Sequence, residues 1–182
     1  MKKLLVVVAL GLVVAGAFLA VDETSPPWYE RIRYPLRYQE IVRGHARNYG
    51  IDPALLAAVI YQESKFDAGA RSGSGAVGLM QLRPDTARGI AIRTGGSAFR
   101  VSDLTNAEIN VRYGCWYLRH LHRKYGDWRL VLAAYNAGQG NVDRWRSEGR
   151  DDIPFAETRH YVDRVEELRG TYRHAWRSEL YE

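Results

Sequence analysis

The sequence is poor in the residues that build covalent cross-links and metal clusters. Its 182 residues contain one cysteine, Cys115, which excludes an intramolecular disulfide, a cysteine-based zinc site and an iron–sulfur cluster. The metalloprotease pattern His-Glu-x-x-His is absent. His120 and His122 are two positions apart, so on a helix they would point to different faces. We therefore expect neither a metal nor a cofactor.

The chain also lacks a strong excess of charge of one sign. Its formal net charge is +5, and removing the two amino-terminal lysines lowers it to +3. The basic residues are spread along the chain, whereas a nucleic-acid-binding surface concentrates them in a patch or stripe. No nucleic-acid partner is predicted. The mild positive charge suits an anionic polymer or a membrane surface instead.

One long apolar run stands at the amino terminus, where residues 4–21 carry no polar side chain. A signal-peptide hydrophobic region is about 7–15 residues long and a spanning helix needs about 20. Residues 15–17, Ala-Gly-Ala, fit a cleavage site, whereas the length of the run and the acidic Asp22 and Glu23 beyond it favour a retained anchor. Residues 1–21 are therefore a signal peptide or a membrane anchor. Both alternatives place residues 22–182 outside the cytoplasm.

The remainder is predicted to form one domain that is mainly α-helical. Residues 22–34 contain two adjacent prolines and read as an extended spacer, which leaves 35–182 as the folded domain. No stretch alternates apolar and polar residues convincingly, so strands should be few and short. Helical spacing of apolar residues, together with capping signals such as a capping box at 105–108, predicts the helices. These cover residues 36–49, 54–64, 84–92, 105–125, 128–137, 142–146 and 157–176.

One acidic residue stands out from this pattern. Glu63 ends a helix that is apolar on every side, and such a helix is buried. It shares a stripe with Leu56, Val59 and Ile60, so burial and the negative end of the helix dipole should both raise its pKa. A general acid working near neutral pH needs a raised pKa. The plain alternative is a solvated glutamate at a helix end.

Four short motifs follow one another along the chain. They are Glu63-Ser64, Gly78-Leu79-Met80-Gln81, Ala134-Tyr135-Asn136-Ala137-Gly138 and Glu157-Thr158-Arg159-His160-Tyr161-Val162. In order and spacing, over residues 36–168, the pattern resembles the soluble lytic transglycosylase (SLT) family, which has a goose-type lysozyme-like fold. The expected fold is then a mainly α, lysozyme-like α+β domain with few short strands, preceded by an N-terminal apolar helix.

The resemblance implies an enzyme of the bacterial cell wall. Such enzymes cleave the β-1,4 bond between N-acetylmuramic acid and N-acetylglucosamine in peptidoglycan, and the role of acid and then base falls on Glu63. The muramic acid 6-hydroxyl attacks its own anomeric carbon and leaves a 1,6-anhydro end. One carboxylate suffices because the substrate's acetamido group assists. A monomer acting on glycan strands is expected. The alternatives are a lysozyme-type hydrolase on the same fold and a non-enzymatic wall-binding protein.

The resemblance also assigns roles to residues of the first two motifs. Ser64 would hydrogen-bond the substrate or orient Glu63. Gly78 would let the backbone approach the sugar closely, because it has no side chain to block it. Met80 and Gln81 would line the cleft.

The resemblance assigns further site residues to the last two motifs. Tyr135 and Asn136 fall where the family keeps a pair beside the catalytic glutamate, and a tyrosine hydroxyl there could hydrogen-bond Glu63 and hold its geometry. Glu157 would position the substrate without acting as a nucleophile. Tyr161 would line the site.

Overall fold

The computed structural model describes residues 26–182, so the apolar segment 4–21 lies outside the described residues. The described part is mainly helical, as predicted. The α-helices are α2 (Pro27–Arg33), α3 (Gln39–Tyr49), α4 (Pro53–Ser64), α5 (Pro84–Arg93), α6 (Ala107–Tyr125), α7 (Trp128–Ala137), α8 (Gln139–Ser147), α9 (Ala156–Ala175) and α10 (Arg177–Tyr181), and the 3-10 helix η1 spans Val101–Thr105. Extended pairing in this range is limited to two isolated bridges, Arg71 with Val77 and Val77 with Leu82. None of the helices in 26–182 is long and apolar enough to cross a membrane.

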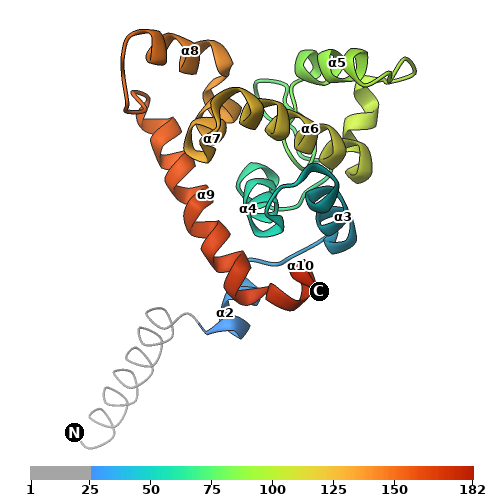
Figure 1. The fold of residues 1–182 in the computed structure, drawn as a ribbon. Helices are drawn as coiled ribbons and strands as arrows, with labels where there is room; N and C mark the ends of the chain where they lie inside the picture. Colours follow the sequence, from blue (N-terminus) through green and yellow to red (C-terminus); the bar gives the residue numbers. More distant parts are fainter. Residues whose placement is uncertain (1–25) are drawn as a thin grey trace, which may run out of the picture.

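Helix α4 forms the centre of the domain, with α3, α6, α7 and α9 around it (Figure 1). The Asp52 side chain caps its first turn by accepting a hydrogen bond from the amide of Ala54 at 3.1 Å, and Pro53 occupies the first helical position. Every residue from Ala54 to Ile60 is completely buried. The sequence predicts that this helix is buried because it has no polar face, and the structure confirms it: neighbouring helices cover every side.

The buried side chains form two cores. The larger one surrounds α4 and takes in α3, α6, α7 and α9. The smaller one lies under α5 and η1 and is built on Val77, Leu82, Ile90, Leu104 and Tyr113. The rings of Tyr117 and Tyr135 pack against both cores. The boundary between the two cores is therefore lined by aromatic side chains.

The predicted capping box at the start of α6 is wrong by one residue. Asn106, not Thr105, is the N-cap, and its side chain accepts a hydrogen bond from the amide of Ile109 at 3.1 Å. Thr105 instead ends η1, and its hydroxyl donates to the carbonyl of Ser102. Thr105 does not cap α6 because it belongs to the 3-10 helix η1, which was not predicted.

The prediction of an extended spacer is wrong for residues 27–33, which form α2. Pro27 starts this helix at a position where proline is favoured. Arg31 then fixes α2 to the carboxy-terminal helices: its Nε donates to the carbonyl of Ala175 at 2.7 Å, and its guanidinium pairs with Glu179 at 2.9 Å. It also lies over the ring of Trp176, 4.6 Å from the ring centre. Contacts distant in sequence make this segment part of the folded domain.

Helix α10, which was not predicted, is held by Asp52. The second carboxylate oxygen of Asp52 accepts hydrogen bonds from Arg169, at 2.7 Å, and from Arg173. The oxygen that caps α4 also accepts one from the Tyr181 hydroxyl. Burial would raise the pKa of Asp52, but these three donors outweigh it and lower the pKa. One carboxylate thus connects the start of α4 to the end of the chain.

Changing Asp52 to asparagine should make stability less dependent on pH. Asparagine can still cap α4, but it removes the charge that Arg169 and Arg173 share, at a cost of about 1.5–3 kcal/mol near pH 7. Because the folded pKa of Asp52 is lowered, its contribution is complete above the unfolded pKa of about 4 and is lost as the pH falls through the folded pKa. Urea unfolding of both proteins should therefore converge at low pH. A difference that stays constant down to about pH 2 would contradict this role.

Candidate active site

The carboxyl group of Glu63 lies in the last turn of α4, half-buried at the surface of the larger core. Its Oε1 accepts a hydrogen bond from the Tyr161 hydroxyl at 2.7 Å. Burial raises the pKa of Glu63 to about 7, and the hydrogen bond from Tyr161 offsets part of that rise. Within residues 26–182 no basic side chain forms an ion pair with it. Glu63 can therefore hold or release a proton near neutral pH.

The tyrosine that contacts Glu63 is not the one predicted. Tyr135, at the end of α7, donates its hydroxyl hydrogen to the carbonyl oxygen of Met80 at 2.7 Å. Tyr161 reaches Glu63 because α9 packs along α4 and places this buried ring beside the last turn. Tyr135 thus fixes the backbone of the Gly-rich loop, residues 69–83 between α4 and α5, and Tyr161 orients the carboxyl group of Glu63.

Ser64 does not orient Glu63, which is one of the two roles predicted for it. Its hydroxyl lies 3.2 Å from the carbonyl of Ile60 in its own helix and 2.8 Å from the carbonyl of Leu79, and it donates to these two acceptors. Immediately after it, Lys65 and Phe66 both adopt left-handed backbone angles, with φ of 52° and 63°. The chain therefore turns sharply out of α4, and Ser64 ties this turn to the Gly-rich loop instead of orienting Glu63.

The interior of the protein requires a glycine at position 78. Its φ is +84°, and a Cβ built there would lie 2.2 Å from both the carbonyl oxygen of Leu104 and Nδ2 of Asn110. Met80 was predicted to line the cleft, but its side chain is completely buried. The thioether sits so close to α6 that a Cβ at Gly114 would lie 2.1 Å from its sulfur.

Asn110, which was not predicted as a site residue, holds the Gly-rich loop in place. Its side chain is completely buried on α6. Its Oδ1 accepts from the amide of Met80 at 2.8 Å, and its Nδ2 donates to the carbonyls of Val77 at 2.9 Å and Leu104 at 2.8 Å. All hydrogen-bonding positions but one are thereby used. One feature of the sequence could have identified it: Asn110 is a polar residue on the otherwise apolar, buried stripe of α6.

A groove lies between the two cores, and Tyr135 is part of its lining. Its lining comes from the Gly-rich loop and α5 on one side and from α6 and α7 on the other: Gln81, Leu82, Arg83, Thr86, Tyr117, Tyr135, Asn136, Ala137 and Gly138. Three of the predicted residues, Gln81, Tyr135 and Asn136, are therefore brought together here. Gln81 has a positive φ of 45°, and its amide donates to the carbonyls of Ala70 and Gly78.

Glu157 lies in the first turn of α9 with its side chain exposed, and it forms no hydrogen bond or ion pair with another described residue. Its neighbour Thr158 is buried and donates its hydroxyl hydrogen to Oδ1 of Asn136 at 2.8 Å. The motif at the start of α9 thus fixes the orientation of Asn136 through Thr158 and of Glu63 through Tyr161, whereas Glu157 is left to solvent.

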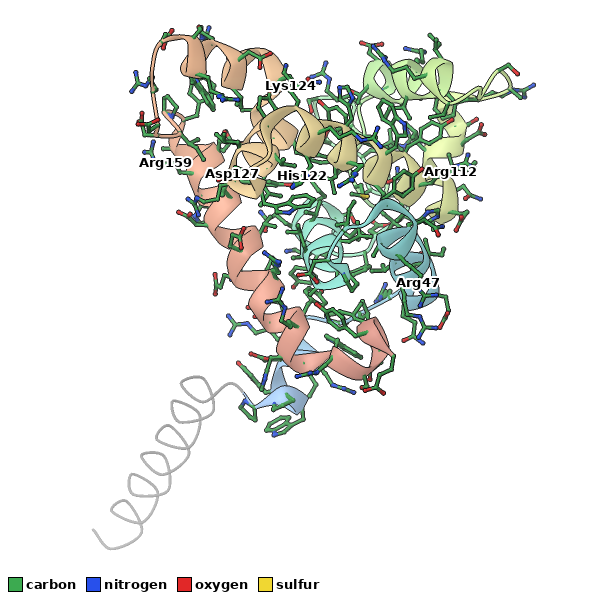
Figure 2. The ribbon with its side chains drawn as sticks, in the orientation of Figure 1. Arg47, Arg112, His122, Lys124, Asp127 and Arg159 are labelled. Carbon is green, nitrogen blue, oxygen red and sulfur yellow. The ribbon has the colours of Figure 1, made fainter. Side chains whose placement is uncertain are left out.

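The two histidines and the cysteine considered for chemistry pack against aromatic rings or lie in the core. His122 on α6, labelled in Figure 2, has its ring 4.5 Å from that of Trp128 at the start of α7. The ring of His120 stacks on that of Trp116. Cys115 is completely buried, and burial raises the pKa of its thiol. Among residues 26–182, no group of three His, Cys, Asp or Glu side chains is placed to hold a metal ion.

Removing the Tyr161 hydroxyl should move the basic limb of the pH–activity profile to higher pH. The hydrogen bond from Tyr161 favours the charged carboxylate, so its loss lets burial raise the pKa of Glu63 further. A hydrogen bond to a charged group contributes about 1.5 kcal/mol or more, and about 1.4 kcal/mol corresponds to one pKa unit. In Tyr161→Phe, Glu63 should therefore stay protonated to a pH about one unit higher. The matched control is Tyr135→Phe, whose lost hydroxyl bonds Met80. Equal displacement of both profiles would contradict the assignment.

A helical domain with two cores, a groove between them and a half-buried glutamate at the end of its central helix has the architecture of the lysozyme-like enzymes. Comparison with known proteins gives the family. Residues 40–154 match the Transglycosylase SLT domain, and the chain belongs to this family.

Individual relatives agree with this result. The chain is 35% identical over 153 residues to the soluble lytic murein transglycosylase of Salmonella typhimurium, covering 78% of this chain and 24% of the relative. It is 36% identical to an endo-type membrane-bound lytic murein transglycosylase A of Klebsiella pneumoniae, covering 76% and 74%. The structure of an inactive mutant of lytic transglycosylase Slt from Pseudomonas aeruginosa superimposes with a TM-score of 0.74 at 34% identity, covering 81% and 26%. The chain thus spans about a quarter of the length of the soluble relative.

Proposed function

We propose that this protein is a peptidoglycan lytic transglycosylase with Glu63 as its general acid and base. The observation that carries the proposal is the state of Glu63: a half-buried carboxyl with a pKa of about 7, one oxygen of which is held by Tyr161. Burial raises the pKa of Tyr135, which lines the groove, and Glu63 lies close enough to that tyrosine to raise it further. The motifs of residues 36–168 and the names of the relatives agree with this activity.

The reaction needs a group that gives a proton and then takes one. Protonated Glu63 would donate to the glycosidic oxygen as the bond to N-acetylmuramic acid breaks, and the substrate's acetamido group would stabilise the cationic centre. The resulting carboxylate would then accept the proton of the muramic acid 6-hydroxyl as that oxygen bonds the anomeric carbon. A pKa near neutral lets one group perform both transfers. Tyr161, by donating to Oε1, would leave Oε2 for the substrate.

Other residues would hold the glycan strand. Gln81, Tyr135 and Asn136 line the groove, and Asn136 is kept in orientation by Thr158. Glu157, exposed at the start of α9, would bind or position the substrate rather than take part in bond breaking. Ser64, Gly78 and Met80 would act on the substrate indirectly, by shaping the Gly-rich loop.

The proposed location is outside the cytoplasm, at the bacterial cell wall. Residues 1–21 would direct export as a signal peptide or a membrane anchor, and the catalytic unit would be residues 35–182 with α2 docked onto it. The same comparisons include relatives described as soluble and as membrane-bound.

Purified peptidoglycan incubated with the protein should release muropeptides that resist reduction by borohydride. A 1,6-anhydro end has no free aldehyde to reduce, whereas hydrolysis leaves a reducing end. Reducible products alone would support the lysozyme-type alternative. An absence of soluble products at any enzyme concentration, with retained binding to the polymer, would support a wall-binding protein.

A further inference from the structure

Helix α2 has one face docked on the domain and one apolar face that is exposed among residues 26–182. Arg31 fixes the docked face to α9 and α10, and Trp176 adds a hydrogen bond from its indole to the carbonyl of Tyr34 at 3.0 Å. On the other face, four residues apart, Trp28 is 58% exposed and Ile32 is 74% exposed. Large apolar side chains paired at this spacing form a continuous surface patch.

The position of this patch in the chain points to its occupant. The apolar run 4–21 ends seven residues before Trp28. A chain of seven residues spans at most about 25 Å when fully extended. When residues 4–21 insert into a bilayer, α2 must therefore lie close to the surface of that bilayer.

The composition of α2 and the residues after it fits a membrane surface. Apart from Arg31, which is docked on the domain, residues 27–38 contain two arginines and one glutamate, together with a tryptophan and three tyrosines. Tryptophan and tyrosine favour the membrane–water interface, and arginine favours anionic headgroups. Figure 1 shows α2 at the opposite end of the domain from α5, and Thr86 of α5 lines the groove.

We propose that the Trp28–Ile32 face of α2 docks on the anionic phospholipid bilayer that holds residues 4–21. The helix is fixed to the folded domain, so docking sets the orientation of the whole enzyme. The side of the groove formed by α5 then lies at the end of the domain away from the membrane. The inference rests on the retained-anchor alternative of the proposed function, but it can be tested without any measurement of activity.

The chain itself offers a clean probe for this contact. Its one cysteine, Cys115, is completely buried, so a cysteine introduced at the surface can be labelled selectively. Ile32→Cys places a fluorescent probe on the proposed face. Ile92→Cys is the matched control, because Ile92 is also an isoleucine, is 83% exposed and lies on α5.

The full chain would be synthesised without cells, in the presence of vesicles of phosphatidylcholine and phosphatidylglycerol, so that residues 1–25 are retained. The probe at position 32 should emit at shorter wavelength and be quenched several-fold more by brominated lipids than the probe at position 92. Adding Trp28→Ser should reduce this quenching. Equal quenching at the two positions, or a shift at position 32 that appears in detergent without lipid, would overturn the proposal. The same holds if the chain fails to float with the vesicles.

Discussion

Glu63→Gln is expected to lower the rate of glycan cleavage by about 10²–10⁴-fold, the range that a general acid or base contributes. Glutamine has nearly the same shape and can still accept the hydrogen bond from Tyr161. It cannot donate a proton to the leaving oxygen and then remove one from the attacking hydroxyl. The loss should therefore appear at every pH, because no titration restores the missing group. Release of soluble muropeptides from purified peptidoglycan measures it.

The matched control is Asp67→Asn, four residues further along the chain. Asp67 is exposed, and its carboxylate accepts a hydrogen bond from the amide of Gly69 at 2.8 Å, outside the groove lining. This change should leave most of the activity. Circular dichroism and thermal unfolding should show both variants folded. Comparable activity of Glu63→Gln and the wild type would refute the assignment of Glu63.

Gly78→Ala should produce the largest loss of stability from a single added carbon. The left-handed backbone costs a non-glycine residue about 1–2 kcal/mol, and overpacking of a close-packed region typically costs about 1–3 kcal/mol more. Both apply, because φ is +84° and the new Cβ would meet Leu104 and Asn110 at 2.2 Å. The expected total is about 3 kcal/mol, or roughly 10 °C in melting temperature. Displacing Asn110 should also release Met80 and reduce activity.

Gly75→Ala separates the two causes. Gly75 has nearly the same angle, with φ of +82°, but a Cβ there would meet nothing within 4 Å. Its cost should be the backbone part alone, about 1–2 kcal/mol. Urea unfolding of the two variants tests the difference. If both lose the same stability, the contact with Asn110 and Leu104 does not carry the effect.

Local signals in the sequence were enough for most helices of the described region. α4 could be predicted because it combines an aspartate cap, a proline at its first position and apolar residues on all sides. α2 and α10 were not predicted because their stability comes from contacts distant in sequence, through Arg31 and Asp52. A segment of five to seven residues has too little local signal to be stable alone.

The candidate site was predictable in its residues but not in their contacts. The motifs indicate Glu63, Tyr135 and Tyr161, yet the packing of α9 on α4 decides which tyrosine reaches the acid. Asn110 lies outside every motif, and its role depends on the path of the Gly-rich loop through space. Side-chain partners across 30 residues or more cannot be inferred from spacing along one chain.

The source of the oxygen at the newly formed end tests the proposed reaction most directly. Peptidoglycan should be digested by the protein in water enriched in ¹⁸O, and the products should be weighed by mass spectrometry. Attack by the muramic acid 6-hydroxyl predicts muropeptides about 18 Da lighter than reducing ones and free of the heavy isotope. Products that carry one ¹⁸O at a reducing end, and no anhydro species, would contradict transglycosylation and identify a hydrolase.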